Sequence, residues 1–443
     1  MEMIIKNDIE IIDYNERILR FCEENLVVDN PDYIIANRLG RYVGKMEKRL
    51  KLYVRNGNRL ILPYGCLSSV WSLCRGSSYK CLFEPFKGNK LVGGIKLYDY
   101  QENAMADLLY GKNGVLEAPC GSGKTQIGLE FIKRVGGKAL WLTHTKKLLE
   151  QSLERAKTYF EGDFGTIIEG KVNIGRDITF ATVQTMREID PEIYKNEFDM
   201  VIVDECHHCV GTPTKVMQFY QVVTNLNCRY KLGLSATLSR SDKMENCIYF
   251  LLGKKLHSIS EREVGNKIIK AKHVRVDLYG EYELEDYCLP DGMIDYSKLV
   301  NLLSNDEKRN KEIIECVVNQ YKRGKKQMIL CSRLSQISYL GNLLKEKGIK
   351  TNIITGKVKQ KERDYDGDVI IATYALAKEG LDIPTLDVVH FATPQKDKTI
   401  VKQSAGRVER NVEGKEQPLV IDYVDVNIDY CVHAFNVRRR LLK

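Results

Sequence analysis

Hydrophobic and polar positions follow different periods in the first ninety residues and in the remainder of the chain. Residues 49–54 and 59–63 alternate between polar and apolar side chains, and the two runs are joined through Asn56-Gly57. Alternation is typical of a half-buried strand, and Asn-Gly is a favoured turn for a tight hairpin. The first region therefore predicts a small folded module that contains a hairpin.

After Gly93-Gly94, short apolar runs alternate with helical patterns up to about residue 260. Residues 114–117 predict a strand, residues 198–203 form an apolar run of the buried-strand type, and residues 126–132 predict a helix. Strands and helices in alternation predict a parallel sheet covered by helices.

A second alternating series follows a segment that interrupts the pattern. Residues 271–300 lack the alternation and carry a group of acidic side chains, so we expect them to connect two lobes. A helix is predicted at residues 306–322, and strands are predicted at residues 327–331, 369–372 and 419–423. The chain is thus expected to be an α/β protein with two tandem parallel-sheet lobes after a small α+β domain. The predicted domains are residues 1–92, 93–265 and 266–443.

Composition is typical of a globular protein without a membrane segment. The chain has 443 residues, 43% of them apolar, which is enough for several buried cores. It contains no run of eighteen apolar residues and no basic-then-apolar leader at its start, so we expect a cytoplasmic protein that does not contact membranes. Thirteen scattered cysteines favour free thiols, and Cys206-His207-His208-Cys209 lacks a second ligand pair at zinc-finger spacing.

Charge is distributed unevenly within the first region. Residues 1–37 contain three basic and nine acidic side chains, whereas residues 38–90 contain twelve basic and two acidic ones. Such a basic segment is typical of proteins that bind polyanions. A solvated basic surface without a partner is the alternative. The residues expected to contact nucleic-acid phosphates are Arg41, Lys45, Lys48, Lys51, Arg55 and Arg59.

A phosphate-binding loop is predicted between the strand at 114–117 and the helix after it. Glycines let backbone N–H groups surround phosphate oxygens, Lys124 can neutralise the β and γ phosphates, and Thr125 can hold magnesium. Ala118 stands where the strict motif has its first glycine. The loop residues expected to bind the nucleotide are Pro119, Cys120, Gly121, Ser122, Gly123, Lys124 and Thr125.

A second catalytic segment, Asp204-Glu205-Cys206-His207, follows the strand predicted at residues 198–203. At the end of a buried strand Asp204 can reach the metal ion that Thr125 also binds, and Glu205 can orient the attacking water. The loop and this segment together predict a nucleoside triphosphatase that uses magnesium.

Further motifs occur in the order found in superfamily 2 helicases and translocases, and this resemblance covers about residues 95–425. Residues 97–101 resemble the adenine-reading segment, which implies that the nucleotide is ATP and that Gln101 bonds the base edge. Residues 143–145 and 181–186 resemble two strand-end motifs that touch one nucleic-acid strand. The residues that this resemblance implies in contact with the strand are Thr143, Thr182, Gln184 and Thr185. Residues 235–237 resemble the segment that links hydrolysis to strand grip, through hydrogen bonds toward the region of Asp204.

The second lobe carries the remaining motifs of the same resemblance. Residues 373–382 resemble a motif that contacts the strand through Thr373 and the nucleotide through Gly380 and Asp382. Residues 403–410 match an arginine-finger motif. Arg407 and Arg410 are three residues apart, so one helical face can direct both across the cleft between the lobes toward the γ-phosphate. The resemblance implies two RecA-like lobes, and the implied catalytic residues are Lys124, Asp204, Glu205, Arg407 and Arg410.

The chain resembles the phage UvsW-type branch and the related XPB-like helicases more than DEAD-box RNA enzymes in residues 97–101, 181–186, 204–207 and 235–242 taken together. The compact basic domain ahead of the two lobes is also similar to the phage branch. This resemblance implies an ATP-dependent DNA helicase or translocase that remodels branched, forked or duplex DNA during repair, recombination or replication, in the host cytoplasm if a phage encodes it. An RNA helicase remains an alternative, because the catalytic motifs do not distinguish the sugar. A nucleic-acid-dependent ATPase that signals without unwinding is another. The motor subunit of a restriction system is disfavoured, since no nuclease-like domain is evident.

Overall fold

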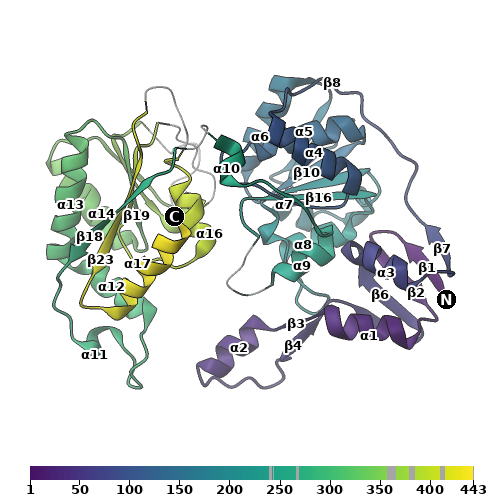
Figure 1. Cartoon of the computed structure of the whole chain (residues 1–443), viewed down its shortest axis with the longest axis horizontal. Helices are drawn as coiled ribbons and strands as arrows, with labels where there is room; N and C mark the ends of the chain where they lie inside the picture. The colour runs from purple at the N-terminus through teal and green to yellow at the C-terminus, as the bar shows by residue number, and fades with distance from the viewer. Residues whose placement is uncertain are drawn as a thin grey trace. The chain divides into compact units, whose positions relative to one another are not determined.

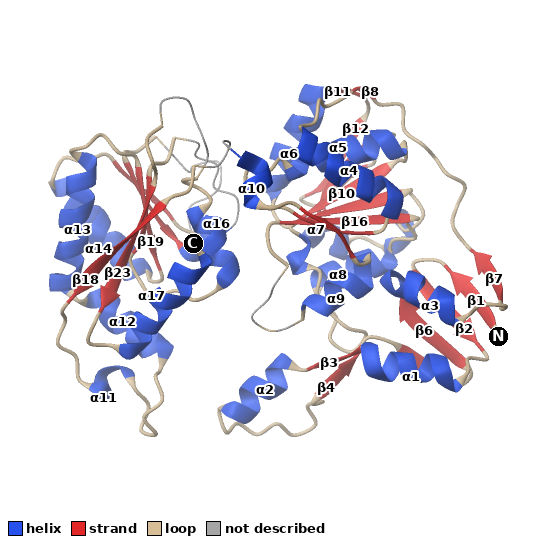
Figure 2. Cartoon of the chain, viewed as in Figure 1, coloured by secondary structure: helices blue, strands red, loops and turns tan. Residues whose placement is uncertain are grey.

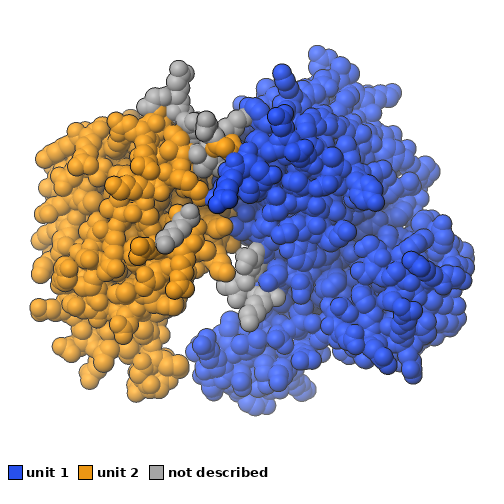
Figure 3. Space-filling view, in the orientation of Figure 1, with its two compact units in different colours: residues 1–263 blue, residues 264–443 orange. Residues whose placement is uncertain are grey.

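The computed structural model describes residues 1–238, 242, 244–265, 269–356, 366–378, 385–409 and 415–442. The chain divides into two compact units, unit 1 at residues 1–263 and unit 2 at residues 264–443 (Figure 3). Unit 1 contains a five-stranded sheet formed by residues 2–81, called the N-terminal module below, and a first lobe built on a parallel sheet, whereas unit 2 contains the second parallel sheet (Figure 1). No helix among the described residues combines the length and apolar character that a membrane crossing requires.

The N-terminal module is built on a five-stranded sheet that buries one face. Its strands, in sheet order, are β5 (Val54–Asn56), β6 (Arg59–Pro63), β2 (Asp8–Ile12), β1 (Glu2–Ile5) and β7 (Ser78–Cys81). A separate pair consists of β3 (Val27–Asp29) and β4 (Arg49–Lys51). The helical elements are α1 (Glu16–Asn25), α2 (Pro31–Arg38), η1 (Tyr64–Cys66) and α3 (Leu67–Leu73).

The predicted hairpin is present, but its first strand is shorter than expected. Strand β5 pairs with β6 so that Asn56 faces Arg59, which makes Gly57 and Asn58 the turn residues instead of the predicted Asn56 and Gly57. Gly57 has a φ of +60°, the left-handed value that the first turn position of a type II′ hairpin requires. The expectation of one strand over residues 49–54 is wrong. Leu52 and Tyr53 are both buried, which breaks the alternation, and β4 pairs with β3 instead.

The core of the N-terminal module continues into the first lobe, because buried apolar residues of both belong to one cluster. The Tyr64 hydroxyl donates to the Arg229 carbonyl at 3.0 Å. The buried Lys231 ammonium donates to the Asn7 carbonyl at 3.2 Å and lies 4.7 Å from the centre of the Tyr64 ring. Burial lowers the pKa of Lys231 to about 8. A Cβ atom on Gly65 would lie 2.3 Å from the Tyr249 carbonyl oxygen, so the two backbones are in close contact.

The first lobe is an eight-stranded sheet in which every described neighbouring pair is parallel except β12 and β13. Its strands, in sheet order, are β13 (Lys171–Asn173), β12 (Phe164–Ile168), β14 (Ile178–Thr182), β10 (Ala139–Thr143), β15 (Met200–Asp204), β16 (Tyr230–Ser235), β9 (Gly114–Glu117) and β17 (Lys255–Ser258). A small pair, β8 (Val92–Gly93) and β11 (Phe160–Glu161), lies outside it. The predicted parallel sheet is therefore confirmed.

Helices cover both faces of this sheet, with α4, α5 and α6 on one side and α8 and α9 on the other (Figure 2). The helical elements are α4 (Asp99–Gly111), α5 (Lys124–Val135), α6 (Lys146–Tyr159), α7 (Val183–Glu188), η2 (Pro191–Ile193), η3 (Cys206–His208), α8 (Gln218–Asn225), α9 (Glu245–Leu252) and α10 (Glu261–Val264). This arrangement places the loops that follow the parallel strands at one edge of the sheet, where ligands of α/β folds bind.

Unit 2 is built on a six-stranded sheet in which all described neighbours are parallel. The strands, in sheet order, are β18 (Lys272–Leu278), β23 (Leu419–Asp425), β22 (Val388–Phe391), β19 (Gln327–Cys331), β21 (Val369–Thr373) and β20 (Thr351–Ile354). Its helices are α11 (Leu284–Tyr287), α12 (Tyr296–Asn305), α13 (Glu307–Tyr321), α14 (Leu334–Glu346), α15 (Tyr374–Lys378), α16 (Lys398–Ala405) and α17 (Asp429–Leu441).

The prediction that residues 271–300 only connect the lobes is wrong at its start. Residues 272–278 form the edge strand β18, which pairs with β23 along its full length. An edge strand is half-exposed, so His273 and Arg275 alternate with valines in place of a continuous apolar run. The strands predicted at residues 327–331, 369–372 and 419–423 correspond to β19, β21 and β23.

Candidate functional site

The loop after β9 is shaped by two glycines and ends at the N-terminus of α5. Gly121 and Gly123 have φ values of +83° and +82°, in the left-handed region where other residues are strained. Gly123 is the N-cap of α5, so Lys124 and Thr125 supply N–H groups of its first turn. A helix N-terminus with free N–H groups attracts anions. The loop thus has the geometry of a phosphate cradle.

Two polar groups of this loop fit a phosphate ligand. The Lys124 ammonium donates to the Ala118 carbonyl at 3.0 Å and lies 3.4 Å from the Pro119 carbonyl oxygen, so it spans the loop. The Ser122 hydroxyl is buried and has no hydrogen-bond partner among the described residues. A buried hydroxyl without a partner is costly, and a phosphate oxygen would satisfy it. Pro119, Cys120 and Thr125 are half-buried around the same turn.

Gln101 is buried directly against the loop. Its Nε2 donates to the Ser122 carbonyl at 2.8 Å, and its Oε1 accepts from the backbone N–H of Tyr98 at 2.9 Å. The Tyr100 hydroxyl donates to the same Ser122 carbonyl at 3.1 Å. Gln101 therefore holds the loop in addition to its predicted contact with a base, for which one amide hydrogen and one oxygen lone pair remain. Sequence reasoning missed Tyr100, although it lies within the same motif.

Asp204 and Glu205 lie at the carboxyl end of β15, two strands away from the loop in the sheet order β15-β16-β9. Asp204 is buried, and its Oδ1 accepts from the Glu205 N–H at 3.0 Å. Burial, and then the neighbouring Glu205 carboxylate, raises the pKa of Asp204 to about 7, against the opposing charge of Lys124. A buried carboxylate next to a second carboxylate is stabilised by a cation, so the pair fits a divalent metal ion.

Strand β16 connects the loop with the Asp-Glu segment. The Ser235 hydroxyl lies 3.0 Å from His207 Nδ1, and that nitrogen lies 3.2 Å from a Glu205 carboxylate oxygen. The Ser235 carbonyl accepts from the Ala118 N–H at 2.9 Å. The expected link between residues 235–237 and the Asp204 region is thus confirmed. Ser235 therefore contacts both halves of the site.

The two predicted strand-end motifs lie side by side. Thr143 ends β10 and Thr182 ends β14, and the two residues are direct neighbours in the parallel register. Gln184 Nε2 donates to the His144 carbonyl at 2.8 Å, which joins the motifs. The threonine hydroxyls face the protein: Thr143 bonds the Ala181 carbonyl at 3.3 Å. Thr182 bonds the Thr185 hydroxyl at 3.0 Å.

All three threonines are buried, so their hydroxyls position the strand ends rather than project from the surface. A histidine stack connects this region to the Asp-Glu segment. The His144 ring lies 4.6 Å from the His208 ring, and His208 lies 4.2 Å from His207, centre to centre. Sequence analysis missed this stack, because only the fold brings His144 beside η3.

Within unit 2, Thr373 ends β21 beside the last residue of β19 and is half-buried. Arg407 follows α16 and is half-buried, and its N–H donates to the Ser404 carbonyl at 3.3 Å. In the same motif the Gln403 side-chain oxygen and the Ser404 hydroxyl are buried without hydrogen-bond partners in the described part of the chain. Gly380, Asp382 and Arg410 lie outside the described residues.

The six basic residues predicted to contact phosphates are all exposed in the N-terminal module. Three of them have partners there: Arg55 donates to the Tyr14 hydroxyl at 2.6 Å, Arg59 lies 2.8 Å from Glu10, and the Lys51 ammonium lies 5.8 Å from the centre of the Tyr53 ring. Arg41, Lys45 and Lys48 form no ion pair with another described residue. These three charges are therefore available to a polyanion, whereas Glu10 partly compensates the charge of Arg59.

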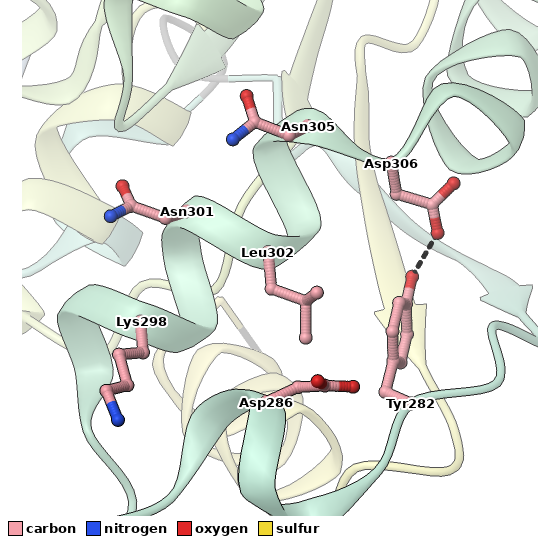
Figure 4. A pocket seen from close by; sticks show the side chains of 7 residues that line it. All are labelled: Tyr282, Asp286, Lys298, Asn301, Leu302, Asn305 and Asp306. Atoms are coloured by element: carbon pink, nitrogen blue, oxygen red, sulfur yellow. Dashed lines mark hydrogen bonds between the residues drawn. The ribbon is translucent and has the colours of Figure 1, made fainter.

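Unit 2 also has an open pocket of about 540 Å³ between α11 and α12 (Figure 4). The Tyr282 hydroxyl donates to Asp306 at 2.5 Å across it, and burial together with this carboxylate raises the pKa of Tyr282. The lining residues are Tyr282, Asp286, Lys298, Asn301, Leu302, Asn305 and Asp306. None of them belongs to a predicted site, so we assign the pocket no part in the reaction.

Comparison with known proteins gives matches along most of the chain. The family model described as type III restriction enzyme, res subunit, matches residues 94–240, and the helicase conserved C-terminal domain matches residues 308–412. A protein of Acanthamoeba polyphaga mimivirus named as an ATP-dependent RNA helicase, L396, is 28% identical over 411 residues, which cover 89% of this chain and 77% of that protein.

The ATP-dependent DNA helicase uvsW of Enterobacteria phage T4 is 23% identical over 463 residues, which cover 91% of this chain and 88% of the phage protein. Among solved structures, S. cerevisiae Dbp5 bound to RNA and ADP BeF3 is similar with a TM-score of 0.56 at 16% identity, over 78% of this chain and 88% of Dbp5. This likeness supports the assignment of two RecA-like lobes.

Proposed function

Because the chain is an ATP-hydrolysing helicase of superfamily 2, we propose that it remodels branched or forked DNA. The observation that carries this proposal is the basic surface of the N-terminal module. Its Arg41, Lys45 and Lys48, which pair with no described carboxylate, belong to the same compact unit as the phosphate loop. Charges fixed to the motor can hold one duplex arm while the lobes act on another strand. The named DNA helicase of phage T4, similar over 91% of this chain, supports the choice of DNA.

We assign ATP binding to Gln101 and to residues 119–125, with Gly380 and Asp382 contributing from unit 2. Lys124 neutralises the β and γ phosphates, and Thr125 and Asp204 hold the magnesium ion. When bound, that ion neutralises charge that develops on the phosphate oxygens. Glu205 is adjacent to Asp204 and orients the attacking water. His207 lies 3.2 Å from a Glu205 carboxylate oxygen, so it fixes the orientation of this carboxylate.

In this proposal Arg407 and Arg410 stabilise transition-state charge, since a planar guanidinium can bond two phosphate oxygens at once. When hydrolysis removes the γ-phosphate, a shift of the phosphate loop moves Ser235, which contacts His207. The histidine stack then transmits this movement to residues 143–145 and 182–185. Those strand ends and Thr373 contact the nucleic-acid backbone. This scheme divides the chain into three functional parts. Residues 1–92 hold DNA, residues 93–265 form the ATP-binding lobe, and residues 266–443 contain the second lobe.

An RNA helicase is the second candidate, because the mimivirus relative is named as one and is similar over 89% of this chain. ATPase stimulation by duplex, single-stranded, forked and four-way DNA and by RNA of matched length separates the two. We expect forked and four-way DNA to stimulate most. Stimulation by RNA alone would reject the DNA assignment, and stimulation without strand or triplex displacement would indicate a signalling ATPase.

The basic surface is tested separately by salt titration. Replacing Arg41, Lys45 and Lys48 by glutamine should weaken DNA binding and lower the slope of log affinity against log salt by about 0.9 for each phosphate that the protein no longer neutralises. The matched control replaces Lys345, Lys347 and Lys350, which are exposed around the C-terminal end of α14. An equal change of slope in both triple variants would show that the N-terminal charges have no special role.

A further inference from the structure

The N-terminal module carries an arm, residues 31–48, which consists of α2 and the loop that returns to β4. Helix α2 has no buried residue, and it projects from the β3–β4 pair (Figure 1). Asn30 fixes the base of the arm, since its N–H donates to the Lys48 carbonyl at 3.0 Å and its Nδ2 to the Glu47 carbonyl at 2.8 Å. The arm is therefore anchored at its base while most of its surface is in solvent.

Large apolar side chains are exposed along this arm. Their exposed fractions are 50% for Ile34, 54% for Ile35, 44% for Leu39, 95% for Tyr42 and 39% for Met46. Single exposed apolar residues are common, but five within thirteen consecutive residues form a patch of the kind that contacts a partner. The Tyr42 ring lies over Gly44, where an added Cβ atom would be 2.8 Å from the ring.

The charge of the arm identifies the chemistry of that partner. Its basic residues are Arg38, Arg41, Lys45 and Lys48, and its acidic residues are Asp32 and Glu47. Asp32 already pairs with Lys215 at 2.6 Å, which leaves the arm still more basic. A partner must therefore combine negative charge with flat apolar surfaces. Nucleic acid has this combination wherever bases are accessible beside phosphates, as at the end of a duplex arm.

We infer that the arm contacts bases at the branch point of the substrate, with Tyr42 stacked on the base pair next to the junction. Arg41 and Lys45 flank Tyr42 in the sequence and hold the adjacent phosphates. Ile35 on α2 and Leu39 at the C-cap of this helix lie four residues apart and form an apolar edge against the parted strands. This inference rests on the proposed function, and it adds contacts with bases to the phosphate contacts proposed above.

The test uses the full-length protein and a forked DNA with 2-aminopurine at the branch point. Tyr42→Ala should weaken fork binding about tenfold or more, as expected when one aromatic ring no longer stacks on a base. It should also abolish the change in 2-aminopurine fluorescence on binding, and Tyr42→Phe should restore both. Binding to a covalently closed circular duplex, which has neither an end nor a branch, should change less than twofold, because the phosphate contacts remain.

Tyr110→Ala is the matched control, since Tyr110 is also 95% exposed but lies on α4 in the first lobe. Equal fork binding by the two alanine variants, or a retained fluorescence change in Tyr42→Ala, would overturn the inference. Loss of self-association in Ile34→Ser/Ile35→Ser with fork binding intact would also overturn it, because the patch would then be a contact between copies. If the wild-type protein itself shows no preference for branched DNA, the result rejects the proposed function and not only the inference about the arm.

Discussion

Replacing Gly123 by alanine tests whether the phosphate loop and Gln101 act as one structural unit. Gly123 has a φ of +82° and a ψ of +34°, and an alanine in this left-handed conformation costs about 1–2 kcal/mol. The added methyl group would lie 2.4 Å from Gln101 Nε2, so the amide must move. Moving it breaks hydrogen bonds of 2.8 and 2.9 Å within a buried site, at a further cost of about 1–3 kcal/mol.

The same helix offers a matched control at its other end. Gly136 is the C-cap of α5 with a φ of +77°, and an added Cβ atom there would meet no described atom within 4 Å. Gly136→Ala should therefore cost only the backbone strain, about 1–2 kcal/mol, whereas Gly123→Ala should cost about 2–5 kcal/mol. Only Gly123→Ala should also weaken the binding of a fluorescent ATP analogue.

Tryptophan fluorescence during urea unfolding measures these differences in unit 1, because both tryptophans, Trp71 and Trp141, belong to it. Trp141 is buried beneath α5, where it touches Gly128. In a Gln101→Ala background the cost of Gly123→Ala should fall to that of the backbone strain alone. A cost that stays the same in this background, or an equal cost for Gly136→Ala, would refute the proposed contact.

Three further predictions follow from the site and its surroundings. Lys124→Ala and Glu205→Gln should each abolish ATP hydrolysis with little change in the unfolding midpoint; retained turnover would reject these roles. Arg407→Ala should reduce kcat far more than ATP affinity, and Arg407→Lys should rescue little, because an ammonium lacks the planar fork; equal losses of kcat and affinity would indicate binding alone. Lys231 releases its proton near pH 8 when folded but near 10.5 when unfolded, so unfolding takes up a proton between these values. The contribution of Lys231 to the stability of unit 1 should therefore rise with pH over this window by up to about 3 kcal/mol. Buried cysteines of the same unit have raised pKa values and act in the opposite direction, so the difference between the wild-type and Lys231→Met profiles in the urea assay measures the contribution of the lysine.

The central strands were predictable from sequence because both of their faces are buried. Residues 115–116 and 328–331 are apolar, and they form the centres of β9 and β19. Strand β18 escaped prediction because an edge strand alternates charged and apolar residues and has no full apolar run. The pairing of β3 with β4 was not predicted either, because the paired residues are about twenty positions apart in the sequence and are separated by the arm.

The chemistry of the candidate site was predictable where it depends on consecutive residues. The phosphate loop and the Asp204–His207 segment each consist of a strand end and the turn directly after it. Their local sequences are therefore enough to predict them. The directions of the Thr143 and Thr182 hydroxyls were not predictable, because they depend on two strands that the fold places side by side. The bond from Gln101 to the loop likewise depends on the packing of α4 against α5.

The shared core of the N-terminal module and the first lobe restricts how such a protein can be recombined. A chimera joined at residue 92 would separate Tyr64 from Arg229 and Lys231 from Asn7, and it would expose apolar surface on both fragments. The module therefore cannot be exchanged as an independent cassette between related motors. A crossover near residue 263, where the compact units divide, keeps this core intact. Natural or engineered exchange of substrate preference should accordingly transfer the module together with its first lobe.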